Sequence, residues 1–192
     1  MKTKHLALLL PLVFVLSACG KTDARTAFEA FSSDLNEQDA LAFTARVRAE
    51  YDDRRAEFTL NYAADEESTR ITVVSPEIIR GVSARIRAGE TALEYEGVSL
   101  DTGALDDFGL SPMSALPLLI ETLKTGYLDT AWEEDGALCA VLVPSDGVSV
   151  QVKLDKYTKT PLSAEISSDG RVRVFAEISD WSLTGLMIED NI

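Results

Sequence analysis

Apolar and polar residues alternate along most of this 192-residue chain, in two blocks that a more uniformly apolar stretch separates. From residue 43 to residue 51, for example, Phe, Ala, Val, Ala and Tyr alternate with Thr, Arg, Arg and Glu. Successive side chains of a β-strand point to opposite faces of its sheet, so this period of two predicts strands with one apolar and one polar face. Short turns between such strands predict an antiparallel sheet.

Turn-forming residues divide the two blocks into ten or eleven strands. Asp52-Asp53 separates the first two strands, and Asp-Gly pairs at 135–136, 146–147 and 169–170 separate several later ones. Residues 97–100 either continue the fifth strand or start a short sixth. The other predicted strands cover residues 43–51, 56–62, 69–73, 82–87, 92–96, 128–134, 137–143, 148–154, 162–167 and 172–179.

An amphipathic helix is predicted at the start of the domain, over residues 24–35. Asp23 is its candidate N-cap, and Phe28, Phe31 and Leu35 share one face. Since no linker or internal repeat divides the chain, residues 24–192 are predicted to form a single domain.

A second helix is predicted near residues 112–124, between the two blocks of strands. Ser111 is a candidate N-cap, Pro112 suits the first helical position and Gly126 closes the segment. Pro117 lies early enough to kink the helix rather than abolish it. The fold class predicted is therefore α+β and mostly antiparallel β, with an N-terminal helix and a helical insertion.

The stretch LSACGKT, from Leu16 to Thr22, ends like a phosphate-binding loop and begins like a lipoprotein processing site. The phosphate-loop interpretation fails, because Val15 stands where that motif requires its first glycine. The other interpretation fits. A positive start, the apolar run LALLLPLVFVL and two small residues precede Cys19, which is the architecture of a signal peptide. The alternative is an ordinary cleaved leader followed by a chance cysteine.

Leu-Ser-Ala-Cys resembles the bacterial lipobox, and this resemblance implies a signal peptide over residues 1–18 and diacylglycerol on the Cys19 thiol. Residues 19–23 would then be the lipidated cysteine and a short tether. Two acyl chains make a stable membrane anchor, whereas one does so only marginally. The predicted location is extracytoplasmic and anchored to the cell membrane. Gly20, in place of Asp, suggests the outer membrane if the cell has two.

Composition excludes several kinds of chemistry once the leader is removed. The only histidine, His5, leaves with the leader, so the mature chain has none for acid–base catalysis or for a zinc site. Removing Lys2 and Lys4 takes the formal net charge from −14 to −16, which argues against nucleic acid as a partner. Cys139 lies in an apolar run and is predicted to be a buried small hydrophobe. No metal and no cofactor are predicted.

Catalysis is not predicted for this chain. The carboxylate pairs Asp106-Asp107 and Glu133-Glu134 are the strongest candidates, since a glycosidase needs only two carboxyl groups. Adjacent residues of a strand point to opposite faces, however, so neither pair converges by itself. Arg46, Arg48, Arg85 and Arg87 fall on the polar faces of their strands and are predicted to be solvated.

Two blocks of strands around an apolar helix, after an N-terminal helix, resemble the LolA/LolB-like lipoprotein-carrier superfamily. The segments VSPEIIRGV (residues 74–82) and GETALEYEG (residues 89–97) look like its strand–Pro, strand and Gly-x-x-x-Leu-x-Tyr region. The resemblance covers residues 24–184. It implies a strongly curved, unclosed β-barrel of about 10–11 strands whose concave face holds acyl chains or another hydrophobic ligand. The superfamily includes carriers, receptors, mycobacterial lipid-binding lipoproteins and a clostridial germination lipoprotein (GerS-like).

Two functions follow from this resemblance. The first is a membrane-anchored lipoprotein that binds a lipid or another hydrophobic ligand. The second is an interaction or scaffold lipoprotein that stabilises or localises an envelope or spore-cortex enzyme, with the acidic residues 88–192 as its contact surface. Whether the concave face is an open cavity or a filled core separates the two. The predicted ligand-binding residues are Phe43, Val47, Phe58, Leu60, Tyr62, Ile71, Leu93, Tyr95, Leu116, Leu119, Ile120 and Leu123.

Overall fold

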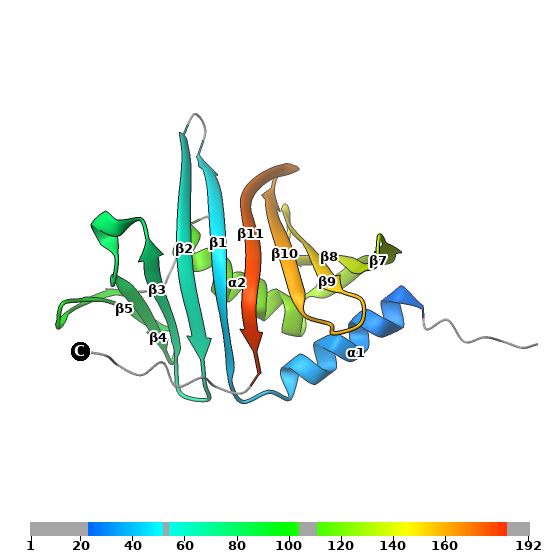
Figure 1. The fold of residues 1–192 in the computed structure, drawn as a ribbon, viewed down its shortest axis with the longest axis horizontal. Coiled ribbons are helices and arrows are strands. Elements are labelled where there is room, and N and C mark those ends of the chain that lie inside the picture. Colours follow the sequence, from blue (N-terminus) through cyan, green and yellow to red (C-terminus); the bar gives the residue numbers. More distant parts are fainter. Residues whose placement is uncertain (1–22, 52–53, 104–110, 184–192) are drawn as a thin grey trace, which may run out of the picture.

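The computed structural model describes residues 23–51, 54–103 and 111–183 (Figure 1). Two α-helices occur in this part of the chain, α1 (Ala24–Asn36) and α2 (Pro112–Thr125), together with one short 3-10 helix, η1 (Glu77–Ile79). The strands are β1 (Leu41–Tyr51), β2 (Arg54–Ala64), β3 (Thr69–Ser75), β4 (Ser83–Arg87), β5 (Glu90–Tyr95), β6 (Val98–Gly103), β7 (Tyr127–Glu134), β8 (Ala137–Ser145), β9 (Val148–Asp155), β10 (Pro161–Ser168) and β11 (Arg171–Ser182).

All of these strands belong to one antiparallel sheet, in the order β6-β5-β4-β3-β2-β1-β11-β10-β9-β8-β7. Each block forms a meander, and the two meanders meet where β1 pairs with β11, with Val47 opposite Ala176. The sheet does not close, because β6 and β7 remain as its two edges. Register shifts in several strand pairs add local bends. The predicted fold class is confirmed, and residues 98–103 form a separate sixth strand.

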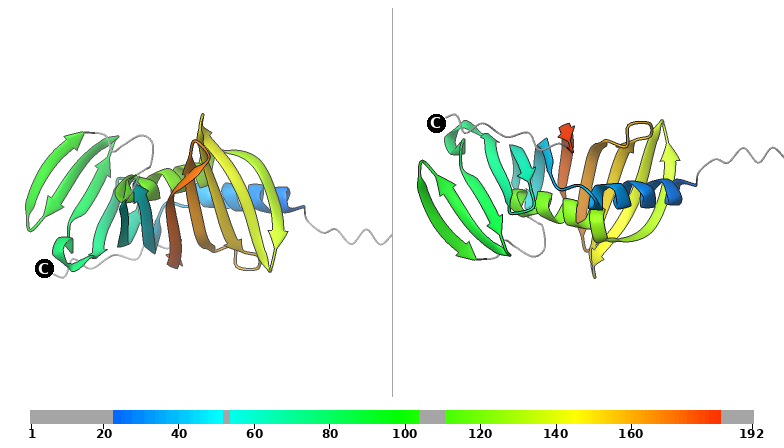
Figure 2. Two further views of the ribbon diagram at one scale, coloured as in Figure 1. Left: turned by 90° about the horizontal axis from the view of Figure 1, so that it is seen from above. Right: turned by 90° about the horizontal axis from the view of Figure 1, so that it is seen from below.

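Helix α2 connects the two edges of the sheet, since it lies between β6 and β7 in the chain. To make this connection it runs across the concave face, where it contacts β1, β8 and β10 (Figure 2). Helix α1 lies beside α2 and packs against β7 and β8. The two helices therefore cover the part of the concave face formed by the second block of strands.

The core lies between these helices and the inner face of the sheet. Val47, Leu60 and Ile71 point inward from β1, β2 and β3, and each is fully buried. Leu138 and Val150 do the same from β8 and β9. The alternation seen in the sequence thus supplies the inner face, and burial of each large aliphatic side chain contributes about 1.5–3 kcal/mol.

The ends of both helices were predicted with partial success. Ser111 is the N-cap of α2, where its side chain accepts a hydrogen bond from the Ser114 amide at 3.1 Å and the Ser114 side chain reciprocates in a capping box. Helix α2 continues through Pro117 to Thr125. Asp23 stands at the N-cap position of α1, but its side chain makes no capping hydrogen bond, so that part of the prediction is wrong.

The Asp-Gly turn signals form tight hairpins. Asp135 and Gly136 have φ angles of 48° and 78°, and Asp169 and Gly170 have φ angles of 51° and 72°. Positive φ at both central residues is the type I′ geometry, whose twist matches that of the adjoining strands. These turns therefore set the registers of the β7–β8 and β10–β11 hairpins.

Candidate ligand site

Most of the predicted ligand-binding residues lie in a packed core. The side chains of nine of them are buried and belong to one hydrophobic cluster: Phe43, Val47, Leu60, Tyr62, Ile71, Leu116, Leu119, Ile120 and Leu123. Phe58 and Leu93 are half-buried and pack against the same cluster. Tyr95 is 45% exposed at the end of β5. Only Tyr62 and Ile120 of this set also reach the crevice described next.

A crevice of about 380 Å³ lies where the middle of α2 faces the ends of β1 to β4. We call it the α2 crevice. Its volume is within the 300–1,000 Å³ that small-molecule sites usually occupy. It is lined by the residues Gln38, Asp39, Ala40, Leu41, Tyr62, Ala64, Asp65, Glu66, Thr69, Ile86, Pro117, Ile120, Glu121 and Lys124.

Apolar side chains form the inner wall of the α2 crevice. Leu41 and Tyr62 come from the inner faces of β1 and β2, and both are buried. Ile86 of β4 is half-buried, as is Pro117 of α2, and Ile120 of α2 is 5% exposed. These side chains belong to the hydrophobic core or pack beside it. The crevice is therefore an opening at which the concave face of the sheet is exposed to solvent.

Tyr62 supplies the polar group within this wall. Its side chain is 4% exposed, and its ring stacks on Phe43 with centroids 4.7 Å apart. The pKa of Tyr62 is raised to about 12. Burial is the largest cause and raises it, a side-chain hydrogen bond with Thr69 lowers it, and the negative charge of Glu121 raises it. Tyr62 therefore stays a neutral phenol at physiological pH and can take part in hydrogen bonds at the crevice.

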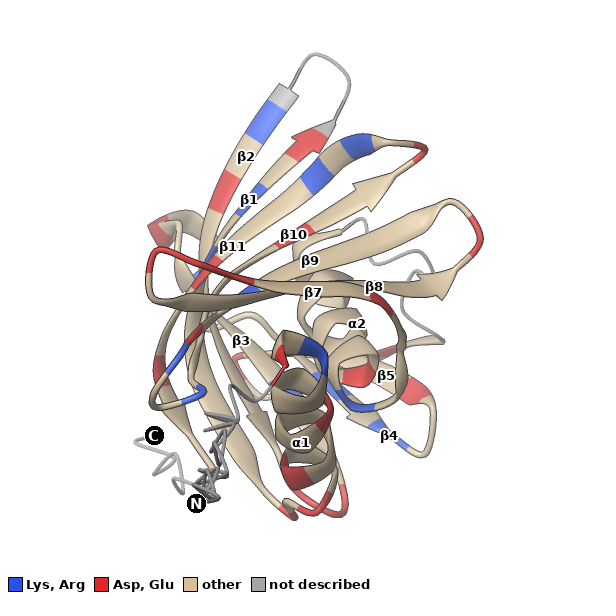
Figure 3. Cartoon of the chain, turned by 90° about the vertical axis from the view of Figure 1, so that its right-hand side faces the viewer, with Lys and Arg blue, Asp and Glu red and all other residues tan. Residues whose placement is uncertain are grey.

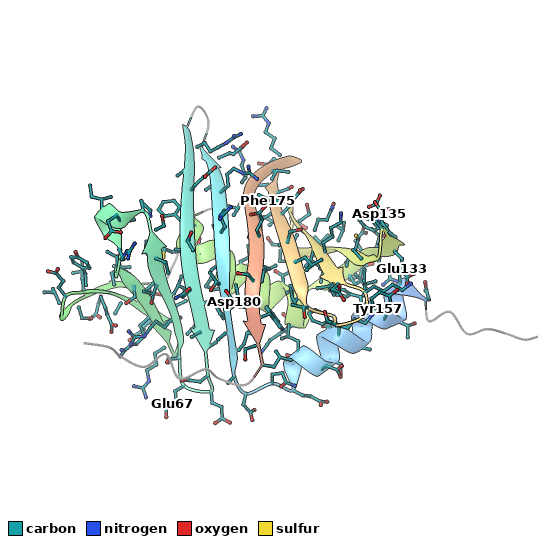
Figure 4. The ribbon with its side chains drawn as sticks, in the orientation of Figure 1. Glu67, Glu133, Asp135, Tyr157, Phe175 and Asp180 are labelled. Atoms are coloured by element: carbon teal, nitrogen blue, oxygen red, sulfur yellow. The ribbon has the colours of Figure 1, made fainter. Side chains whose placement is uncertain are left out.

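The rim of the α2 crevice is acidic. Asp39, Asp65, Glu66 and Glu121 are exposed there, and Lys124 is the basic side chain among the lining residues. The β2–β3 turn that carries Asp65 and Glu66 also carries Glu67, which lies at the lower end of the sheet (Figure 4). Figure 3 shows further acidic residues on the loops at the C-terminal end of α1.

Sequence reasoning missed most of the α2 crevice. Leu41, Ile86 and Pro117 were not predicted as ligand residues, and the acidic rim was not predicted at all. The crevice collects residues from the α1–β1 loop, the β2–β3 turn, β4 and α2. Periodicity within one segment cannot show that these four segments meet, so no local signal was available.

A second, more polar hollow of about 370 Å³ lies over β3, β4 and β5. Arg70, Ser83 and Glu94 line it together with Tyr95 and the β5–β6 turn. The Glu94 carboxylate bridges two guanidinium groups, those of Arg70 at 3.3 Å and of Arg85 at 3.2 Å. This ion-paired cluster links the three neighbouring strands. The wall of this hollow is therefore less apolar than that of the α2 crevice.

The four arginines predicted to be solvated lie on the polar face of the sheet, where Arg46 and Arg87 are exposed and Arg48 and Arg85 are half-buried. Arg46, Arg85 and Arg87 pair with Glu177, Glu94 and Glu67 at 3.8, 3.2 and 3.4 Å. Arg48 lies over the ring of Phe175 on the outer face of β11, 4.8 Å from its centroid (Figure 4).

The remaining candidates for chemistry are the two acidic pairs and Cys139. Glu133 accepts a hydrogen bond from the Lys156 ammonium at 2.6 Å, while Glu134 accepts one from the Trp132 indole at 3.5 Å. Asp106-Asp107 lies outside the described residues. Cys139 is free and fully buried, as predicted, and burial raises the pKa of its thiol. In the part of the chain that the structure describes, no group of three or more His, Cys, Asp or Glu could hold a metal ion.

Comparison with protein families and with curated proteins finds no match. Solved structures do match the fold. An uncharacterised conserved protein from Thermus thermophilus superposes with a TM-score of 0.52 at 13% identity, covering 85% of this chain and 90% of that one. For a LolA superfamily protein from Nitrosomonas europaea the TM-score is 0.46 at 13% identity, covering 85% and 94%. A chain from the structure of the CwlD amidase of Clostridioides difficile in complex with the GerS lipoprotein gives a TM-score of 0.46 at 13% identity, covering 82% and 94%.

These likenesses concern the fold. The unclosed, curved antiparallel sheet with a helix before it and a helix inserted into it is the architecture that the resemblance to the lipoprotein-carrier superfamily implied, and it is confirmed. None of the helices in residues 23–51, 54–103 and 111–183 is long and apolar enough to cross a membrane.

Proposed function

We propose that this protein is an extracytoplasmic lipoprotein, anchored to the cell membrane through lipid on Cys19, whose domain binds a lipid or another hydrophobic ligand. The observation that carries the ligand-binding part is the α2 crevice, where core side chains of the concave face line an opening of about 380 Å³. Convergent apolar walls with a few polar groups are the usual composition of small-molecule sites. The lipobox at residues 16–19 supports the anchor.

The crevice, rather than the whole concave face, is the proposed binding site. Leu116, Leu119 and Leu123 of α2 are buried in the hydrophobic core, so we assign them to the stability of the fold rather than to the binding site. Tyr62 and Ile120 lie at the margin between this filled region and the crevice. A ligand would therefore insert its apolar part between α2 and the ends of β2 and β4, with its polar part at the rim.

A variant that fills the crevice tests this proposal. We expect Ile86→Trp to weaken binding of the neutral probe Nile red, or of a lipid that copurifies, by about tenfold or more, because a larger side chain occupies the ligand's volume. The matched control is Val172→Trp, since Val172 is a 42% exposed apolar residue of β11 that does not line the crevice. Equal binding by both variants and the original protein, at unchanged melting temperatures, would contradict the crevice assignment.

The anchor has its own test. We expect Cys19→Ser to abolish incorporation of a labelled fatty acid and to move the protein from the membrane fraction to the soluble fraction. Serine has no thiol that can be acylated, and without two acyl chains the protein has no stable membrane anchor. Cys139→Ser is the control, because its buried thiol should not affect fractionation. A Cys19→Ser protein that remains lipid-labelled would show that the anchor lies elsewhere.

A second candidate function is supported by the filled core. The protein would then act as an interaction or scaffold lipoprotein that holds an envelope enzyme at the membrane. Edge strand β6 offers a contact surface, because it forms one edge of the sheet among the described residues and its Val98 and Leu100 side chains are 70% and 63% exposed. We expect Leu100→Lys to remove any partner retained by the membrane-anchored protein at low salt. Retention of the same partner by this variant would exclude β6 as the surface.

A further inference from the structure

The α2 crevice combines an apolar interior with a rim of one predominant charge. Asp39, Asp65, Glu66 and Glu121 surround its mouth, against the single lysine Lys124. Of these acids, Asp39 and Glu66 form no ion pair with any residue that the structure describes. Their charges are therefore available to an incoming ligand.

Local structure keeps this rim negative. The Asp65 carboxylate accepts hydrogen bonds from the Glu67 and Ser68 amides, each at 2.8 Å, and these bonds lower the pKa of Asp65. The Glu121 carboxylate accepts a bond from the Thr125 hydroxyl at 3.3 Å. These backbone hydrogen bonds, together with the nearby Arg87 guanidinium, keep Asp65 ionised. The Thr125 hydroxyl holds the Glu121 carboxylate in place.

The C-terminal ends of α1 and α2 add to the negative electrostatic potential at the rim of the crevice. Helix α1 ends at Asn36, directly before the Gln38–Leu41 segment that lines the crevice, and Glu121 and Lys124 belong to the last turns of α2. The C-terminus of a helix carries a partial negative charge of about half an elementary charge. Ser32 and Asn36 satisfy the Lys124 carbonyl at 3.1 and 3.4 Å, which brings the C-terminal halves of the two helices together.

We propose that the α2 crevice selects single-chain amphiphiles whose head group is positively charged. The alkyl part would lie between Ile86, Pro117 and Ile120, and the cationic head would sit at the rim near Glu66 and Glu121. A crevice of about 380 Å³ is near the lower end of the usual range for ligand sites, which suits one chain better than a diacyl lipid. An anionic head group would meet four carboxylates there and be repelled.

This inference rests on the proposed ligand-binding function and names the class of ligand. The test compares three ten-carbon amphiphiles below their micelle concentrations: decyltrimethylammonium, decyl maltoside and decanoate. Calorimetric titration uses the mature chain with Cys19→Ser at 20 mM and at 500 mM NaCl. We expect the cation to bind about tenfold more tightly than the neutral compound at low salt, decanoate to bind most weakly, and the preference to shrink at high salt.

Two double variants distinguish the effect of the rim carboxylates on binding from the effect of the protein's overall negative charge. We expect the double variant Glu66→Gln and Glu121→Gln to reduce the preference for the cation several-fold while leaving decyl maltoside binding unchanged. The control is Glu57→Gln with Glu165→Gln, which removes the same charge from the outer faces of β2 and β10 at residues that do not line the crevice. An equal loss in both double variants would overturn the proposal.

The outcomes also distinguish this inference from the function on which it rests. Binding of all three amphiphiles with similar affinity, or tightest binding of decanoate, would overturn the charge selectivity and leave hydrophobic binding intact. Binding of none of them would overturn the ligand-binding function together with the inference.

Discussion

Tyr62 is the residue at which the stability of this fold should depend on alkaline pH. Its side chain is 4% exposed, and its pKa rises to about 12 chiefly because burial penalises the phenolate. The pKa in the unfolded chain is about 10. Since the folded-state pKa lies above the unfolded value, the contribution to stability is fully present below pH 10 and is lost as pH rises through 10 to 12.

We therefore expect the free energy of unfolding to fall by roughly 2–3 kcal/mol between pH 9 and pH 12, given about 1.4 kcal/mol for each unit of pKa shift. Urea titrations at several pH values measure this slope. Tyr62→Phe should flatten it, whereas Tyr157→Phe should not, because Tyr157 is 85% exposed. A Tyr62→Phe protein that loses stability as steeply as the original would show that another group titrates.

At the scale of the element, α2 is the segment that best combines local sequence signals with tertiary contacts. Its N-cap, Ser111, was predicted from the sequence together with Pro112 at the first helical position, whereas the capping box that Ser114 completes was not. Its apolar spacing was foreseeable as well. The path of α2 across the concave face was not, because it follows from the distance between the two sheet edges that α2 connects.

The two N-cap positions provide a matched test. We expect Ser111→Ala to lower the free energy of unfolding by about 1 kcal/mol, because the Ser114 amide loses its partner. Asp23→Ala should cost less than about 0.5 kcal/mol, since the Asp23 side chain makes no capping hydrogen bond. Chemical denaturation of both variants measures the difference. Equal costs at the two positions would contradict the assignment of the larger cost to the hydrogen bond between Ser111 and the Ser114 amide.

At the scale of the whole molecule, charge is the dominant surface property. The chain has 32 acidic and 18 basic residues, a formal net charge of −14. Several acids are left without a cation, as at the crevice rim, so the folded state carries self-repulsion that salt can screen. This repulsion keeps the protein soluble while it opposes compaction.

We expect the melting temperature of the mature Cys19→Ser chain to rise between 10 mM and 300 mM NaCl, by about 2–4 °C for each kcal/mol of repulsion that salt relieves. Potassium chloride should produce the same rise, because screening does not depend on the identity of the cation. Differential scanning calorimetry measures both. A rise in NaCl alone would indicate a bound sodium ion, and no rise in either salt would show that the surface charges are already balanced.

Alternation, turn signals and cap residues are local properties, so the sequence alone was sufficient to predict the strands, both helices, the antiparallel sheet and the burial of Cys139. That the sheet stays open was implied by the resemblance to the lipoprotein-carrier superfamily. The lipobox stays a prediction. The assignment of Phe43, Val47 and Leu116 to an open ligand surface could not be made in this way, since apolar spacing is the same for a packed core and for a cavity lining.

Only the tertiary structure decided which apolar residues are covered. It places β1 beside β11, extends α2 between the two edges and thereby fills the concave face under Leu119 and Leu123. The same arrangement leaves an opening where the ends of four segments meet, with Ile86 inside and Glu66 at the rim. The physical reason is that pairing and packing join residues that are distant in the chain, and no local periodicity records which ones will meet.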